Sequence, residues 1–351
     1  MLTTLLLAAL TQAPASRFTP AHIDSLPLAT TRVDEGANEL VIELPPVEVP
    51  ANGMIRTPVH RARVPFEVAL HGFRVEVLDE AGRVLPNDRL HHFNLTDPDR
   101  RELFAPLPLH VMAASKETPA PSVPWFLLGM PLEAGERYIA SSMLANPENR
   151  PMRLRARLVF SYVRPGVIFP LFEAYPWVMD VKFPLGGEGG RKDFDLPPGK
   201  SAHYWESSPA VPGTIIGLGG HVHDLATSLE LRDMTTGEVI WQQTPVLDSS
   251  GRVSKLPVGR LYKWYRLGVH IEPEHTYRVT VFYDNPTGST IAFGGMGAVA
   301  GLFRPDRGED WPGIDPADGV YLAYIDNLLK NMQGLEMGHG SPGHAHGGHE
   351  H

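Results

Sequence analysis

The chain contains no cysteine among its 351 residues. Disulfide bonds, thiolate metal sites and cysteine nucleophiles are therefore excluded together. Any transition-metal site in this protein must use histidine, methionine, carboxylates or water as ligands. The sequence is well supplied with the first two, because it holds 16 histidines and 11 methionines.

Positive charge is also in short supply. The 31 lysines and arginines are outnumbered by 40 aspartates and glutamates, which gives a formal net charge of −9, and no basic stripe runs along the sequence. Proteins that bind nucleic acids do so largely through clustered basic side chains on the phosphate backbone. We therefore expect no nucleic-acid partner.

Long apolar runs are missing beyond the first residues. No later segment reaches the ~18 apolar residues that a membrane-spanning helix needs, so we expect no span in the mature chain. Residues 1–10 form an apolar run of signal-peptide length, and small residues at positions 13–16 resemble a cleavage site. We predict that residues 1–15 are a signal peptide and that the protein is periplasmic or secreted. The alternative is a buried N-terminal strand or helix.

The composition also argues against long helices. Proline and glycine number 34 each and are spread along the chain, which is typical of many short strands joined by tight turns. Residues 152–160 alternate between apolar and polar, with arginines on one face, as in a half-buried antiparallel strand. The sequence predicts an all-β protein.

An internal repeat indicates two domains. Four residues recur at one constant offset of 139 positions: Glu133, Tyr138, Asn146 and Pro147 match Glu272, Tyr277, Asn285 and Pro286. Chance is the alternative explanation, but a shared architecture explains the common register better. We predict two tandem antiparallel jelly-roll-type β-sandwich domains. Their expected bounds are an extended lead-in at 16–60, a first domain at 61–165, a linker at 166–190 and a second domain at 191–335.

Residues 336–351 differ from the rest of the chain. They carry five histidines among glycines and lack apolar residues that could anchor them. Such a composition predicts a disordered tail that binds soft or borderline metals. A remnant of a purification tag is the alternative, although the spacing of the histidines is irregular.

The sharpest metal-binding motif is the pair His221 and His223, which follows two glycines. Side chains at positions i and i+2 of a strand point to the same face, so both imidazoles can converge on one ion. An exposed pair without a ligand is the alternative. The adjacent pair His91 and His92 is less direct, because neighbours on a regular strand face opposite ways. Both can bind one metal only if the strand ends or bulges there.

Three further histidines are weaker candidates. His110 fits a core residue or one that supports a metal ligand, and His203, which precedes two aromatic residues, is open to either interpretation. His270 lies close to a turn and is expected to be structural.

The order of these motifs resembles the copper type II, ascorbate-dependent monooxygenases, the family of dopamine β-monooxygenase and peptidylglycine α-hydroxylating monooxygenase. His91 and His92 match the His-His pair that supplies two ligands of the family's electron-transfer copper. His221 and His223 match the His-x-His motif of its oxygen-activating copper.

Two shorter stretches extend the resemblance over roughly residues 60–305. Residues 110–114 (HVMAA) resemble a His-Val-Leu-Ala-Ala stretch between the family's first-domain ligands. Residues 294–297 (GGMG) resemble a Gly-Gly-Phe-Gly stretch shortly before its copper-binding methionine. The resemblance is local and gapped, and the order of the motifs carries it.

Two departures concern the third ligands. The family has a histidine three residues before an Asn-Pro-like turn, where this chain has Met143. A thioether is softer than an imidazole and favours Cu(I). The family's methionine ligand falls about six residues beyond the glycine-rich stretch, where this chain has Leu302, and Met296 inside the stretch is the nearby substitute.

The resemblance implies up to two copper ions, each held by two histidines and a methionine: His91, His92 and Met143 for the first, and His221, His223 and Met296 for the second, catalytic one. It implies an exported monooxygenase that hydroxylates a C–H bond of a small-molecule or peptide substrate with dioxygen and a one-electron reductant such as ascorbate. The alternative is a non-catalytic copper-binding or copper-delivery protein. The sequence does not identify a substrate.

Overall fold

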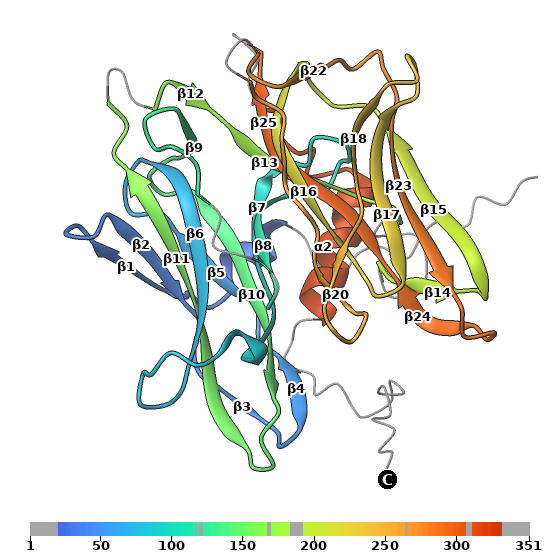
Figure 1. Cartoon of the computed structure of the whole chain (residues 1–351). Coiled ribbons are helices and arrows are strands. Elements are labelled where there is room, and N and C mark those ends of the chain that lie inside the picture. Colours follow the sequence, from blue (N-terminus) through green and yellow to red (C-terminus); the bar gives the residue numbers. More distant parts are fainter. Residues whose placement is uncertain are drawn as a thin grey trace, which may run out of the picture.

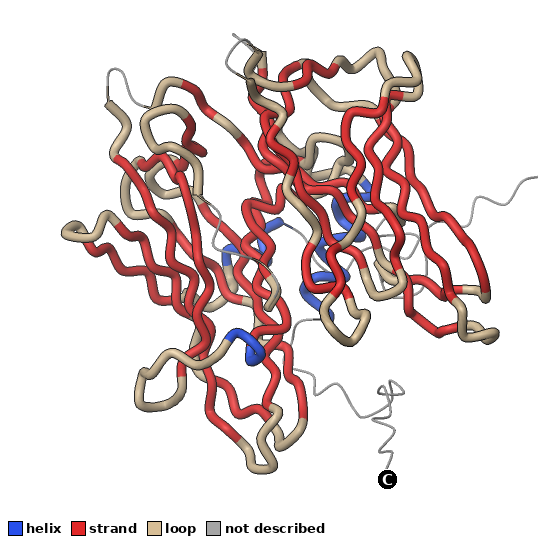
Figure 2. Tube along the Cα trace, in the orientation of Figure 1, coloured by secondary structure: helices blue, strands red, loops and turns tan. Residues whose placement is uncertain are grey.

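The computed structural model describes residues 20–116, 118, 122–166, 170–182, 192–263, 266–306 and 311–331. The expected signal peptide (1–15) and the histidine-rich tail (336–351) lie outside these residues. The described part of the chain is almost entirely β-structure, arranged as two sandwiches side by side with one longer helix between them (Figures 1 and 2). The predicted all-β fold with two jelly-roll-type β-sandwiches is confirmed.

The first sandwich has two sheets within the described residues, antiparallel except for the short edge strand β12. One has the strand order β1-β2-β11-β6-β9-β12 with β3 beside β11, and the other has the order β4-β10-β7-β8 with β5 beside β10. The strand bounds of the first of these sheets are Thr30–Asp34 (β1), Glu39–Glu43 (β2), Val47–Val49 (β3), Val68–Leu78 (β6), Leu128–Leu132 (β9), Met152–Val163 (β11) and Phe172–Glu173 (β12, parallel to β9). Those of the second are Gly53–Arg56 (β4), His60–Arg63 (β5), Leu90–Arg101 (β7), Pro108–Ala114 (β8) and Arg137–Asn146 (β10).

The second sandwich is also antiparallel. Its sheets have the orders β13-β25-β16-β21, with β22 beside β16, and β15-β23-β17-β18; two small pairs, β14-β24 and β19-β20, flank them. The bounds in the first sheet are Tyr175–Asp180 (β13), Gly213–Val222 (β16), Gly259–Arg260 (β21), Val269–Ile271 (β22) and Gly297–Pro305 (β25). Those in the second sheet are Gly199–Ser207 (β15), Ala226–Asp233 (β17), Val239–Gln243 (β18) and Tyr277–Asn285 (β23). The small pairs are Phe194–Leu196 (β14) with Ile291–Gly295 (β24), and Val246–Leu247 (β19) with Val253–Lys255 (β20).

The internal repeat corresponds to one hydrogen-bonding arrangement made twice. Asn146 ends β10 and donates its side-chain amide to the carbonyls of Val49, Pro50 and Arg150. Asn285 ends β23 and donates in the same way to Leu196, Pro197 and Ser289. Each side-chain oxygen also accepts a backbone N–H two residues further on. The recurrence of four matched contacts supports a duplicated sandwich.

Alternation along the central strands decides which faces meet between the sandwiches. In β10, Tyr138, Ala140 and Leu144 are buried in the apolar core, so the intervening Ile139 and Met143 lie on the opposite face. The same holds for β16, where alternate residues near its end either enter the core or point away from it. Each sandwich therefore turns the second face of one sheet toward its neighbour (Figure 1).

A C-terminal helix, α2 (Gly319–Asn331), was not predicted from the sequence. Asp318 caps its first turn by accepting the N–H groups of Val320 and Tyr321. The apolar side chains of Tyr321, Ile325 and Leu329 then follow at four-residue intervals on one helix face. They pack against Ile23 of the short helix α1 (Pro20–Asp24) and against Val59 and Ile139 of the first sandwich.

The helix changes the expected domain bounds. Residues 191–335 were assigned to the second domain, but α2 packs its apolar face on the first sandwich. Residues 166–190, expected as a linker, contain β13, which pairs with β25 along six residues. The lead-in at 16–60 contains β1 to β4, which belong to the sheets of the first sandwich. Of the described helices, none has the length and apolarity to cross a bilayer.

The asparagine arrangement gives a test of the fold. Replacing Asn285 with Ala, or Asn146 with Ala, leaves three backbone carbonyls without their donor in a buried place. We expect each substitution to lower the free energy of unfolding by roughly 2–4 kcal/mol, measured by urea denaturation. The control is Asn149→Ala, in the same turn as Asn146 but exposed. Equal stability of Asn149→Ala and Asn146→Ala would contradict this account of the turn.

Candidate functional site

His91 and His92 lie at a β-bulge. Met143 of β10 pairs with His92, whereas the next residue, Leu144, pairs with Leu90, so β7 carries one extra residue at His91. A bulge turns neighbouring side chains toward one side of a strand, and the two imidazole rings have centroids 4.2 Å apart at an interplanar angle of 72°. The bulge that this pair requires in order to bind one metal is therefore present.

Met143 lies directly across the ladder from His92. Directly opposite residues of an antiparallel pair point to the same face, with Cβ atoms about 4.5–5.5 Å apart. Met143 is largely buried, and Arg56 of β4 pairs with it from the other side. The thioether, a guanidinium and the half-buried imidazole of His92 thus form one row across three strands.

The surroundings of His92 keep its imidazole neutral. Burial lowers its pKa to about 3, helped by the positive charge that His91, His221, Arg56 and Lys192 would place near it. A neutral imidazole has a free nitrogen lone pair for a metal. The contribution of His221 to the pKa of His92 also carries structural information, because His221 belongs to the other sandwich. His92 and His221 therefore lie near enough across the two sandwiches to interact electrostatically.

The second pair stands at the end of β16. Val222 is buried in the core, so His221 and His223 on either side of it point to the face that meets the first sandwich. Their ring centroids are 5.4 Å apart at 88°. Gly220 allows this strand to pack closely, because a Cβ atom there would lie 2.4 Å from a methyl carbon of Leu229 and 2.6 Å from a backbone oxygen.

Met296 is brought to the same end of the sheet. His221 pairs with Ala298 and Val222 with Gly297, so the continuation of the register sets Met296 opposite His223. Tyr283 fixes this position: its hydroxyl donates to the carbonyl of Met296 and accepts the N–H of Met296 at 3.0 Å and that of His223 at 3.2 Å. Leu302, the alternative by motif spacing, pairs with Gly217 much further along the strand.

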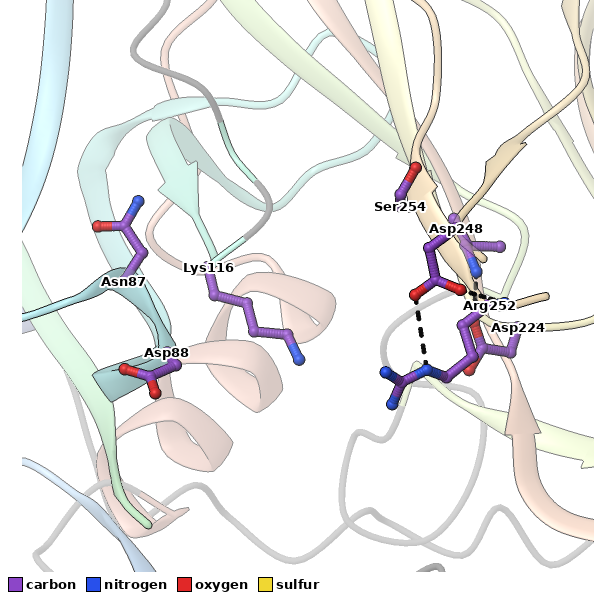
Figure 3. Close-up of a pocket in the computed structure, with 8 residues that line it drawn as sticks. Asn87, Asp88, Lys116, Asp224, Asp248, Arg252 and Ser254 are labelled. Carbon is purple, nitrogen blue, oxygen red and sulfur yellow. Dashed lines mark hydrogen bonds and ion pairs between the residues drawn. The ribbon is translucent and has the colours of Figure 1, made fainter. Parts of the chain in front are cut away.

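A cleft of about 440 Å³ opens between residues of the two sandwiches (Figure 3). One wall comes from the first sandwich and the other from the second, and the lining residues are Asn87, Asp88 and Lys116 on one side and Asp224, Asp248, Arg252, Val253 and Ser254 on the other. The turn η1 (Asn87–Arg89) leads directly into the first histidine pair, and Asp224 follows the second. Asp224 also accepts the N–H of Val253, which fixes the β19-β20 hairpin as a cleft wall.

The remaining histidines have other partners. His203 stacks on Phe194 with ring centroids 3.7 Å apart. The exposed His270 forms an ion pair with Asp306 at 2.9 Å. His110 is held between Glu102 and Tyr324 and contacts no other candidate ligand in the hydrogen bonds of the described residues.

The donor sets of the two sites follow from these positions. Within the described residues, no three histidine, cysteine, aspartate or glutamate side chains converge in a way that could hold a metal ion. Each site instead offers two imidazoles with a methionine beside them. Imidazole and thioether are ligands that copper accepts in both of its common oxidation states, with the thioether favouring Cu(I).

Some residues around the sites gave no signal in the sequence. Tyr283, Arg56 and Lys192 lie far from the histidines along the chain and belong to no motif. Their positions depend on strand pairing and on packing between the sandwiches. The pairing of Met143 with His92 was implied only by the resemblance.

No protein-family model and no curated protein matches the chain. Among solved structures, it is similar to a chain of the Sulfolobus turreted icosahedral virus, with 8% identity, a TM-score of 0.18 and coverage of 78% of this chain and 61% of that one. It is also similar to the infectious bursal disease virus VP2 subviral particle, with 8% identity, a TM-score of 0.25 and coverage of 82% of this chain and 75% of that one. A third similar structure is PNGF-II, with 9% identity, a TM-score of 0.29 and coverage of 79% of this chain and 61% of that one.

This chain thus spans 61% of the length of the first and third of these proteins. Similarities of this size carry no inference about function. The fold described above follows from the strands of this chain and their pairing.

The hydroxyl of Tyr283 gives a test of the second site. Tyr283→Phe keeps the ring but leaves the N–H groups of His223 and Met296 without their acceptor. We expect the free energy of unfolding to fall by roughly 1–3 kcal/mol, measured by chemical denaturation. The control is Tyr204→Phe on the neighbouring strand β15, where the side chain is exposed. If both variants match the parent protein, the hydroxyl does not hold the two segments together.

Proposed function

We propose that this protein is an exported, copper-dependent monooxygenase-like oxidoreductase that hydroxylates a C–H bond with dioxygen and a one-electron reductant. The observation that carries the proposal is the pairing of each histidine pair with a methionine on facing sheets. Met143 lies opposite His92, and Met296 is held beside His223. The proposed substrate is a small molecule or peptide, and the proposed location is periplasmic or secreted.

Each of the two proposed ligand sets would hold one copper ion. His91, His92 and Met143 would hold one ion, and His221, His223 and Met296 would hold the other; bound copper would supply one-electron redox chemistry and a binding position for dioxygen. Three protein ligands leave a coordination position open, as a reactive site requires. The protein itself keeps His92 neutral and fixes Met296 through Tyr283. The cleft between the sandwiches, which Asp224 next to His223 lines, is the proposed place for the substrate.

A second candidate function is copper binding and delivery without catalysis. Met143 in place of a histidine favours it, because a softer ligand set holds Cu(I) and resists cycling. The histidine-rich tail at 336–351 favours it as well, since such tracts bind metals. The His-x-His pair and the two-sandwich architecture favour the enzyme, which is why we give it precedence.

Copper stoichiometry tests the second site. In protein without residues 336–351, we expect His221→Ala to lose one bound copper ion, because one imidazole and one thioether rarely hold copper tightly. The measurement is copper content after dialysis, together with a competition titration of affinity. His270→Ala serves as the matched control, since this exposed histidine lies outside both sites. Unchanged copper affinity in His221→Ala would place the site elsewhere.

Met143→His tests the first site. An imidazole at this position is a harder ligand than the thioether, so we expect a marked gain in Cu(II) affinity relative to Cu(I). The measurement is a pair of competition titrations, one with Cu(II) and one with Cu(I). Met54→His on the neighbouring strand β4, an exposed position, is the control for adding an imidazole elsewhere. Equal Cu(II) gains in both variants would show that Met143 does not face the metal.

Oxygen consumption decides between the two functions. With copper and ascorbate, a panel of small hydroxylatable substrates should reveal product formation coupled to oxygen uptake. Coupled turnover that disappears in both His221→Ala and His91→Ala would establish a monooxygenase. Copper binding at both sites with no coupled turnover would favour the carrier.

A further inference from the structure

Three titratable side chains form a hydrogen-bonded chain between the sandwiches, outside both histidine pairs. The ring of His110 in β8 contacts Glu102 through Nδ1 at 2.8 Å and the hydroxyl of Tyr324 in α2 through Nε2 at 2.8 Å. Glu102 is 1% exposed. The proposed copper sites do not use any of the three groups.

The carboxylate of Glu102 determines which groups donate and which accept in this series of hydrogen bonds. Glu102 accepts the backbone N–H of His110 at 2.7 Å and that of Val178 at 3.2 Å, so it is arranged as an acceptor. Nδ1 of His110 must then donate its proton to the carboxylate, which in a neutral imidazole leaves Nε2 as an acceptor. The hydroxyl of Tyr324 therefore donates to Nε2. The hydroxyl proton of Tyr324 thus points to a basic nitrogen of His110, and the other ring nitrogen of His110 donates to the buried carboxylate of Glu102.

Lys192 links the surroundings of Tyr324 electrostatically to the first histidine pair. Lys192 forms an ion pair with the buried Asp180 at 2.8 Å, and its positive charge acts on both Tyr324 and His92. Burial raises the pKa of Tyr324 to about 12, so the phenol keeps its proton near neutral pH. A neutral phenol can lose an electron readily only if its proton leaves at the same time. His110 offers a place for that proton.

We propose that Tyr324 is a redox-active tyrosine, with His110 as its proton acceptor and Glu102 as the group that stabilises the resulting imidazolium. In the step, the O–H bond of Tyr324 breaks, its proton forms a bond to Nε2 of His110, and one electron passes to an oxygen-derived one-electron oxidant. The products are a neutral phenoxyl radical, an imidazolium paired with Glu102 and the oxidant reduced by one electron.

An ascorbate-class reductant then returns the electron, and the proton goes back from Nε2. The source of the oxidant rests on the proposed function; the redox activity of the tyrosine does not. Such a donor would be useful here because Met143 biases the first proposed copper toward Cu(I), which makes it a weaker electron source.

The experiment uses the full-length, metal-free protein and a photogenerated ruthenium(III) tris-bipyridine complex as the oxidant. Freeze-quenched electron paramagnetic resonance should show a persistent phenoxyl radical, identified by incorporating ring-deuterated tyrosine. We expect the persistent signal to be lost in Tyr324→Phe and retained in Tyr321→Phe, a buried tyrosine one turn away on the same helix. No persistent signal in the parent protein, or an unchanged signal in Tyr324→Phe, overturns the proposal.

A second variant separates the relay from a purely structural contact. His110→Gln can still hydrogen-bond both neighbours but is too weak a base to take the proton. We expect it to lose the persistent radical while near-ultraviolet circular dichroism shows native packing. A wild-type radical yield in His110→Gln would overturn the role of the imidazole. Because the protein contains no copper in these measurements, the result is independent of copper binding and turnover.

Discussion

The alternation of side chains along two central strands is the constraint on which the candidate sites depend. In β10 and β16, one set of side chains fills the core of its own sandwich, so the other set must face outward. The two sandwiches lie with these faces toward each other (Figure 1). Met143 and the second histidine pair are therefore brought to the interface by the same periodicity that builds the cores. The same alternation of side chains is therefore required both for folding and for forming the sites.

Local deviations from that periodicity complete the sites. The extra residue at His91 turns two adjacent imidazoles to one side, which regular pleating would forbid. At the other site, Leu225 adopts a left-handed conformation with φ of 70°, just after His223 and Asp224. A non-glycine residue there is strained, and surrounding contacts must hold it. The N–H of Asp284 donates to the carbonyl of Leu225 at 3.1 Å, and the N–H of Val253 donates to the neighbouring Asp224.

Much of the architecture could be predicted from short-range patterns. Period-2 alternation and frequent turns predicted the strands, and the offset between Asn146 and Asn285 predicted two similar sandwiches because each asparagine organises one turn. The same patterns did not reveal α2, whose apolar face spans only three turns near a proline-rich stretch. They also missed β13 inside the expected linker. Contacts such as that between His110 and Tyr324 join residues more than two hundred positions apart, and no local pattern records them.

The docking of α2 ties the two halves of the chain together. The polypeptide leaves the first sandwich, builds the second and then returns, and Trp311 donates to the carbonyl of Arg101 on the way back. Cutting the chain between the sandwiches would leave the apolar stripe of α2 in water and the surface around Ile139 uncovered. Neither half is therefore a self-sufficient folding unit. The two sandwiches should melt in one cooperative transition, and protein dissection at the sequence midpoint should yield fragments that associate or aggregate.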